Sequence, residues 1–135
     1  MAKKLDLLLV NPAAKKVYQK DQEAANYPAY EPPYLAALTA EFIRSRGFDV
    51  KILDANVNNL SAEEAVERIK DYSPRLIQVI VHGNQPNAST QLMDEVSKIC
   101  AQVKDSSLEA KILLTGTHIS ALPERTLKES KTDYA

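Results

Sequence analysis

The chain has 135 residues, which is enough for one ordinary domain and too few for two. Hydrophobic residues make up 44%, charged residues 26%, and the formal net charge is -1, so the composition is that of a globular protein and gives no electrostatic case for binding nucleic acid. No apolar run reaches the roughly 20 residues that cross a bilayer, and the N-terminus lacks a cleavable signal pattern, so we expect a cytoplasmic protein without membrane contact.

The single cysteine, Cys100, excludes an internal disulfide and any cysteine-cluster metal or iron–sulfur site made by this chain alone. It lies beside Ile99 on an apolar helical stripe, so we expect an inert core thiol.

The first predicted strand covers residues 5–10 and is stopped by Asn11-Pro12. Residues 13–32 show neither helical nor strand periodicity, and three tyrosines lie among them: Tyr18, Tyr27 and Tyr30. A loop of this length inside a compact domain is usually either functional or disordered. The tyrosines favour a functional loop, and a disordered connector is the alternative.

A helix is predicted from Pro33, which suits a first helical position, to the glycine at position 47. Its expected apolar face consists of Leu35, Ala36, Leu38, Ala40, Phe42 and Ile43. Residues 48–53 alternate apolar and polar side chains, which indicates a strand near a sheet edge, and an Asn-rich turn over 54–60 follows. Ser61 and Glu64 form a capping box at the start of a second helix.

After Pro74, the β-branched run 76–81 is typical of a strand buried on both faces of a parallel sheet, and it ends at His82-Gly83. A polar turn over 84–90 precedes a helix whose stripe is Leu92, Val96, Ile99 and Val103. The fourth strand begins at Lys111 and runs into a glycine turn at Gly116, and a short last helix extends from Pro123 to Glu129.

Strands and helices alternate, so right-handed crossovers predict one doubly wound parallel sheet of α/β class, Rossmann-like with a flavodoxin-like strand order. The expected order is 2-1-3-4, with a fifth strand truncated or just starting near Tyr134. We expect residues 1–135 to form a single domain that is the N-terminal piece of a longer protein.

In such a sheet the turns after strands one, three and four converge on one edge, where ligands bind. They supply the candidate site residues Asn11, Pro12, His82, Gly83, Asn84, Gln85, Thr115, Gly116, Thr117 and His118. No G-x-G-x-x-G or G-x-x-x-x-G-K-[ST] sequence occurs, so dinucleotide and nucleoside-triphosphate sites lack their phosphate cradles.

The sequence contains no nucleophile–base pair, paired carboxylates or metal-ligand spacing, so we expect the chain by itself to be non-catalytic and to hold no metal of its own. The ring of His82 or His118 could contact a ligand, or each could cap a strand or helix end by hydrogen bonding. Asp54 is either a turn residue or a ribose ligand. These alternatives stay open at this point.

The chain resembles the N-terminal cobalamin (B12)-binding domain of cobalamin-dependent radical SAM enzymes. The resemblance rests on an ordered set of segments: 7–12, 32–38, 47–50, Asp54, 73–77 and 116–124. The family's glycine pair after strand four has Thr115 in place of its first glycine, and Thr117 and Ile119 stand where prolines are usual. The D-x-H-x-x-G motif, whose histidine ligates cobalt in methionine-synthase-like relatives, is absent after strand one.

This resemblance implies a corrin on the carboxyl edge of the sheet, with its nucleotide tail passing down between strands and helices. The cobalamin would be base-off, without a histidine from the first loop, and His82 or His118 could contact cobalt or a corrin amide. The tyrosine-containing loop would cover the upper corrin face or pack on a catalytic domain.

The resemblance further implies that the partner is a C-terminal radical SAM domain in cis, where S-adenosylmethionine and a 4Fe-4S cluster would bind and where the parent enzyme, a methyltransferase or related radical enzyme, would do its chemistry. The alternative is a cofactor-free Rossmann-like domain that acts in interaction or substrate gating. A stand-alone enzyme for a small anionic ligand is a third hypothesis, for which the sequence offers no residues.

Overall fold

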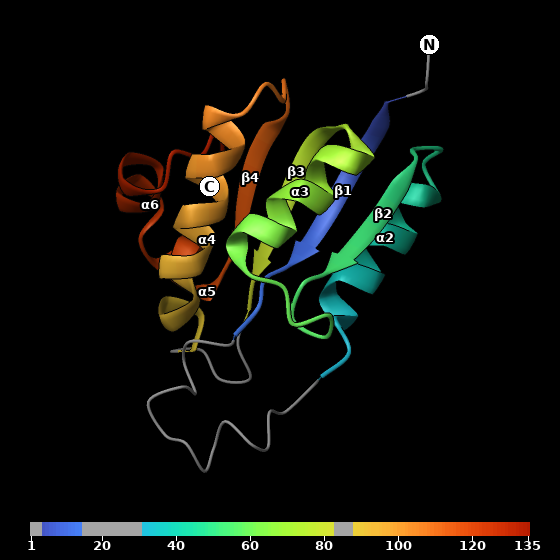
Figure 1. Ribbon diagram of the computed structural model, residues 1–135. Helices are drawn as coiled ribbons and strands as arrows, with labels where there is room; N and C mark the ends of the chain where they lie inside the picture. Colours follow the sequence, from blue (N-terminus) through green and yellow to red (C-terminus); the bar gives the residue numbers. More distant parts are fainter. Residues whose placement is uncertain (1–3, 15–30, 83–87) are drawn as a thin grey trace.

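The computed structural model describes residues 4–14, 31–82 and 88–135, and within them four strands form one parallel sheet (Figure 1). The strands are β1 (Leu5–Asn11), β2 (Val50–Asp54), β3 (Pro74–Val81) and β4 (Lys111–Gly116). Their order is β2-β1-β3-β4, and each neighbouring pair is parallel. The predicted α/β class and strand order are therefore confirmed.

Helices cover the two faces of the sheet unequally (Figure 1). They are α2 (Tyr34–Arg44), α3 (Ala62–Tyr72), α4 (Ala88–Asp105), α5 (Thr117–Ala121) and α6 (Pro123–Glu129). Helices α3 and α4 pack on one face, and α2 packs on the other. The five-residue helix α5 is an addition to the prediction, which had only a turn between Gly116 and Pro123. The capping box at Ser61 is confirmed, because its hydroxyl accepts from the Glu64 amide and the Glu64 carboxylate accepts from the Ser61 amide.

The face under α3 and α4 is closed. The side chains of β3 and β4 that point to it are all at most 1% exposed: Ile77, Val79, Val81, Ile112 and Leu114. Cys100, on α4, is fully buried in the same core, and this burial raises the pKa of its thiol to about 12. The expected place of this thiol in the core is confirmed, and a thiol with that pKa stays protonated at neutral pH.

The opposite core is smaller and lies between α2 and strands β1, β2 and β3, where Ile80 contributes from β3. Ala36 and Ala40 are buried there, and their small side chains let the helix approach the sheet closely. The prediction that Leu38 and Phe42 also point inward was wrong, since they are 65% and 57% exposed. Helical periodicity gives the stripes of a helix, but the contact with the sheet decides which stripe is buried.

Beyond the edge of α2, the same face of β3 and β4 is only partly covered. We call this surface the β3–β4 strip; it consists of Leu76, Gln78, Leu113 and Thr115, each partly exposed. Successive side chains of a strand point to opposite faces, so these four residues alternate with the fully buried ones of the α3–α4 face. The strip is therefore an accessible part of the sheet that lies beside a helix.

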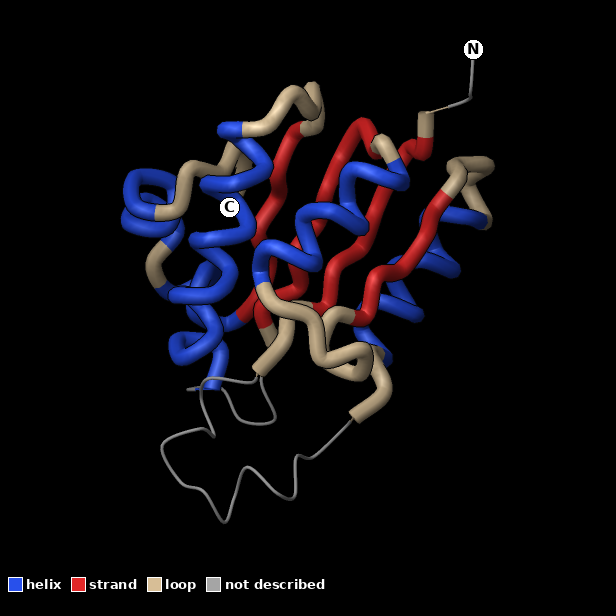
Figure 2. The backbone as a smooth tube through the Cα atoms, in the orientation of Figure 1, coloured by secondary structure: helices blue, strands red, loops and turns tan. Residues whose placement is uncertain are grey.

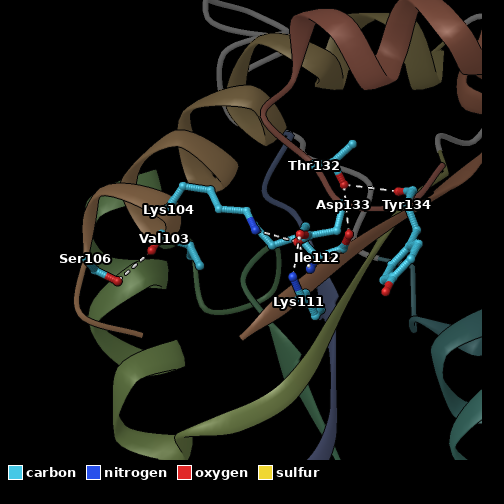
Figure 3. A network of polar contacts seen from close by, with 8 residues as sticks. All are labelled: Val103, Lys104, Ser106, Lys111, Ile112, Thr132, Asp133 and Tyr134. Carbon is cyan, nitrogen blue, oxygen red and sulfur yellow. Dashed lines mark hydrogen bonds and ion pairs between the residues drawn. The ribbon is translucent and has the colours of Figure 1, made fainter. Parts of the chain in front are cut away.

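At the C-terminus, the chain runs alongside the free edge of β4 (Figure 3). Tyr134 forms a parallel bridge with Leu113, at the place where a fifth strand was expected to start. Asp133 accepts hydrogen bonds from Lys104 at 2.5 Å and from the Ile112 amide at 2.8 Å, and Thr132 donates to the Ile112 carbonyl at 2.9 Å. Side-chain contacts thus fix the register of this segment on β4.

Among the residues that the structure describes, no helix is both long enough and apolar enough to span a membrane.

Candidate functional site

The carboxyl ends of the four strands meet at one edge of the sheet, the lower edge in Figures 1 and 2. The chain leaves β1 toward α2 on one face, and it leaves β3 toward α4 on the other. Such a reversal between neighbouring strands opens a crevice at the sheet edge, and ligands of doubly wound sheets bind there. The candidate site is therefore centred between the ends of β1 and β3.

The last residue of β1, Asn11, forms hydrogen bonds to the end of β2 and to the turn that follows it. The Asn11 amide donates to Asp54 Oδ1 at 2.9 Å, and the Asn11 carbonyl accepts from the Ala55 amide at 3.0 Å. Asp54 Oδ1 also accepts from the Val57 amide at 3.1 Å. These contacts agree with the interpretation of Asp54 as a turn residue. The next residue, Pro12, is buried.

His82 follows β3 and is exposed at this edge of the sheet. Its ring meets the ring of Tyr34, the first residue of α2, edge to face, with the ring centres 6.4 Å apart and the planes at 89°. One aromatic side chain from each side of the crevice thus lies at its rim. Three further candidates, Gly83, Asn84 and Gln85, lie outside the described residues, as does most of the predicted long loop 13–32.

The turn from β4 into α5 packs directly against the end of β3. Gly116 has a φ of 147°, and a Cβ atom at this position would lie 1.9 Å from the Val81 carbonyl oxygen. Both the backbone angle and the lack of space require glycine here. The turn therefore has a fixed shape.

Hydroxyl groups from the start of α4 fasten this turn. The buried Ser89 lies 2.7 Å from the Thr117 hydroxyl, and its own oxygen accepts from the His118 amide at 3.0 Å. Thr90 Oγ1 lies 2.9 Å from His118 Nδ1. His118 is thus held by the first turn of α4. The sequence marked this polar stretch only as a set of possible helix caps and did not pair it with the β4–α5 turn.

Gln78 was missed as a site residue. Its side-chain amide donates to Thr115 Oγ1 at 3.1 Å, which bridges β3 and β4 across the middle of the β3–β4 strip. The available signal was a single polar residue inside the β-branched run 76–81. The strip is partly exposed, whereas the opposite faces of β3 and β4 are closed by the fully buried side chains of the α3–α4 side.

The two histidines are held by different neighbours, His82 by Tyr34 and His118 by Thr90. Within the described ranges, no group of three or more His, Cys, Asp or Glu side chains is placed to hold a metal ion. What this edge offers is a rim with two aromatic rings, a fixed glycine turn, and a partly apolar strip with one polar pair.

A family model described as the B12 binding domain matches residues 24–135. No curated protein and no solved structure matches the chain significantly. The matched segment runs from before α2 to the last residue, so it contains the β3–β4 strip, the β4–α5 turn and His82. Four parallel strands in the order 2-1-3-4 are also the arrangement found in B12-binding domains. The chain therefore belongs to the B12-binding domain family.

Proposed function

We propose that this chain is a cobalamin-binding module that is not catalytic by itself. The corrin lies at the carboxyl edge, between the ends of β1 and β3, and the nucleotide tail lies along the β3–β4 strip. Membership of the B12-binding domain family supports binding of the cofactor. The single observation that carries the placement of the tail is the unequal cover of the sheet, whose α2 side stays partly exposed over β3 and β4.

The residues of the strip fit such a tail. Leu76 and Leu113 offer apolar contact to a flat heterocyclic base, and the Gln78–Thr115 pair offers hydrogen bonds. Mostly apolar surroundings with a few placed polar groups are typical of cofactor sites. Thr115 carries a side chain where the family has glycine. Its hydroxyl accepts a hydrogen bond from the Gln78 amide, which also belongs to the strip.

At the edge of the sheet, His82 and Tyr34 are positioned to contact the corrin or its amides. The Gly116 turn holds Thr117 and His118 against α4 and so limits how deeply a ligand can enter on that side. When bound, cobalamin supplies a cobalt centre for methyl or electron transfer. The cobalamin would be held base-off, because its tail would lie along the β3–β4 strip, and it would receive no histidine from the first loop, which lacks D-x-H-x-x-G.

We also propose that the module belongs to a radical SAM enzyme and lies N-terminal to its catalytic domain. The support is the ordered set of sequence segments by which the chain resembles such enzymes. Reading the coding sequence downstream tests this directly, because a radical SAM domain requires C-x-x-x-C-x-x-C. Its absence would remove the radical SAM parent and leave the cobalamin proposal intact.

A second candidate function is an interaction domain that keeps the fold and has lost the cofactor. It is favoured by an exposed apolar stripe on the outer side of α2, where Tyr34, Leu38 and Phe42 are 54%, 65% and 57% exposed. Side chains four residues apart lie on one helix face, so the three form a continuous surface.

Titration with hydroxocobalamin tests the first function. The wild-type chain should co-elute with the corrinoid on a sizing column and change its absorption spectrum. Leu113→Arg, which places a long charged side chain in the strip, should abolish co-elution, whereas the same change at the exposed Leu38 should leave it intact. Circular dichroism verifies that both variants are folded. Lack of binding by the wild type would contradict the proposal, and equal binding by Leu113→Arg would contradict the placement of the tail.

A further inference from the structure

Gln78 is an unusual residue for its position. It lies in the middle of β3, a central strand, opposite Leu9 on one side and Leu113 on the other. Its nearest neighbours on the same face of β3 are Leu76 and Ile80. A partly buried polar side chain among apolar ones costs free energy unless it is hydrogen-bonded, so its presence calls for a reason.

The bond to Thr115 meets only part of this requirement. A primary amide has two N–H donors and one acceptor oxygen, and a hydroxyl can accept and also donate. The bond from Gln78 Nε2 to Thr115 Oγ1 uses one donor and one acceptor. The pair therefore retains the capacity to donate to and accept from a ligand that lies along the β3–β4 strip.

This capacity distinguishes between ligand bases. The amide of glutamine can donate to N1 of adenine and accept from the exocyclic amino group beside it, one hydrogen bond in each direction. The methyl groups of dimethylbenzimidazole offer no such partner, and burying the amide against them costs the amide its contact with water. The two bases thus have unequal affinities for the same strip.

We propose that the Gln78–Thr115 pair selects corrinoids by their lower base and favours adenine over dimethylbenzimidazole. The inference rests on the proposed cobalamin-type function and names the subclass of corrinoid that the site takes. Leu76 and Leu113 pack against the flat base whether it is adenine or dimethylbenzimidazole, whereas the Gln78–Thr115 pair forms hydrogen bonds only with the polar edge of adenine.

The experiment measures dissociation constants of three corrinoids by absorption titration: the adenine form, the dimethylbenzimidazole form, and cobinamide, which lacks the nucleotide. The proteins are the wild type, Gln78→Leu, Thr115→Val, and the control Gln91→Leu, whose residue is exposed on α4. The wild type and the control should bind the adenine form roughly tenfold more tightly than the dimethylbenzimidazole form. Gln78→Leu should lose this preference, Thr115→Val should reduce it, and neither should change the affinity for cobinamide.

The results distinguish the inference from the function on which it rests. If none of the three corrinoids binds to the wild type, the proposed function itself is wrong. If corrinoids bind but the wild type shows no preference for adenine, selection by lower base is wrong and the cobalamin module stands. Selection by lower base is also wrong if Gln78→Leu keeps the preference for adenine or weakens the binding of all three corrinoids equally. Thermal melts compare the stability of the variants, and the isosteric Thr115→Val provides an independent second test.

Discussion

Asp133 fastens the C-terminal segment to β4 and α4 through three neighbours. Its side chain is 17% exposed, and partial burial alone would raise the pKa of its carboxyl. The hydrogen bonds from Lys104, the Ile112 amide and Lys111 outweigh this effect and hold the pKa below the ordinary value of 3.8. The carboxylate is therefore more stable in the folded chain than in the unfolded one.

Asp133→Asn should lower the free energy of unfolding by about 1–3 kcal/mol at neutral pH, because charge-assisted bonds to a partly buried group are lost. Since the folded-state pKa is depressed, the contribution is fully present above the unfolded pKa and is lost as the pH falls through the folded pKa. In urea unfolding, the difference between the two proteins should thus begin to shrink near pH 3.8 and disappear as the pH falls through the lower, folded-state pKa. Asp105→Asn, at an exposed ion pair, is the control with a small effect at any pH. A constant difference down to acidic pH would contradict this account.

Other single residues show where the sequence was informative and where it was not. The predicted ends of β1, β3 and β4 were enough to locate the candidate site residues in the turns that follow these strands. They were not enough to predict which residues these side chains contact. Asn11 bonds to Asp54 across 43 positions and His118 to Thr90 across 28, and no local pattern encodes such pairs. Gln78 was overlooked because a run of β-branched neighbours hides one polar residue, whose partner lies on another strand.

At the scale of elements, the β4–α5 turn depends on one glycine. Gly116→Ala places a Cβ 1.9 Å from the Val81 carbonyl oxygen at a φ of 147°. We expect the substitution to lower the free energy of unfolding by at least about 3 kcal/mol, since backbone must move against backbone. Gly47→Ala is the matched control: its φ is 89°, and its Cβ would meet nothing within 4 Å, so only the backbone strain of about 1–2 kcal/mol applies. Chemical denaturation measures both, and equal losses would show that the close approach at Gly116 is not limiting.

The elements themselves were largely predictable. The capping box at Ser61, the proline at the start of α6 and the strand runs are local signals, and the structure has each of them. The inward stripe of α2 and the separate helix α5 were not predicted, because the first depends on packing against the sheet and the second has only five residues.

At the scale of the whole molecule, the alternation of strands and helices was sufficient to predict the strand order of the sheet, because crossover connections between parallel strands are right-handed. It could not show that the two faces are covered unequally. That difference is a property of the assembled core, where α3 and α4 close one face and α2 leaves the β3–β4 strip accessible. The proposed place of the nucleotide tail follows from this asymmetry and from family membership together.

The most direct test maps the cofactor onto the folded chain by amide proton–nitrogen NMR spectra recorded with and without diamagnetic hydroxocobalamin. The account predicts shifts at Gln78, Leu113 and Thr115 and in the turns after β1, β3 and β4, with the outer residues of α3 unchanged. Spectra that do not change at saturating cofactor, or shifts that cluster on the α3–α4 face, would contradict it.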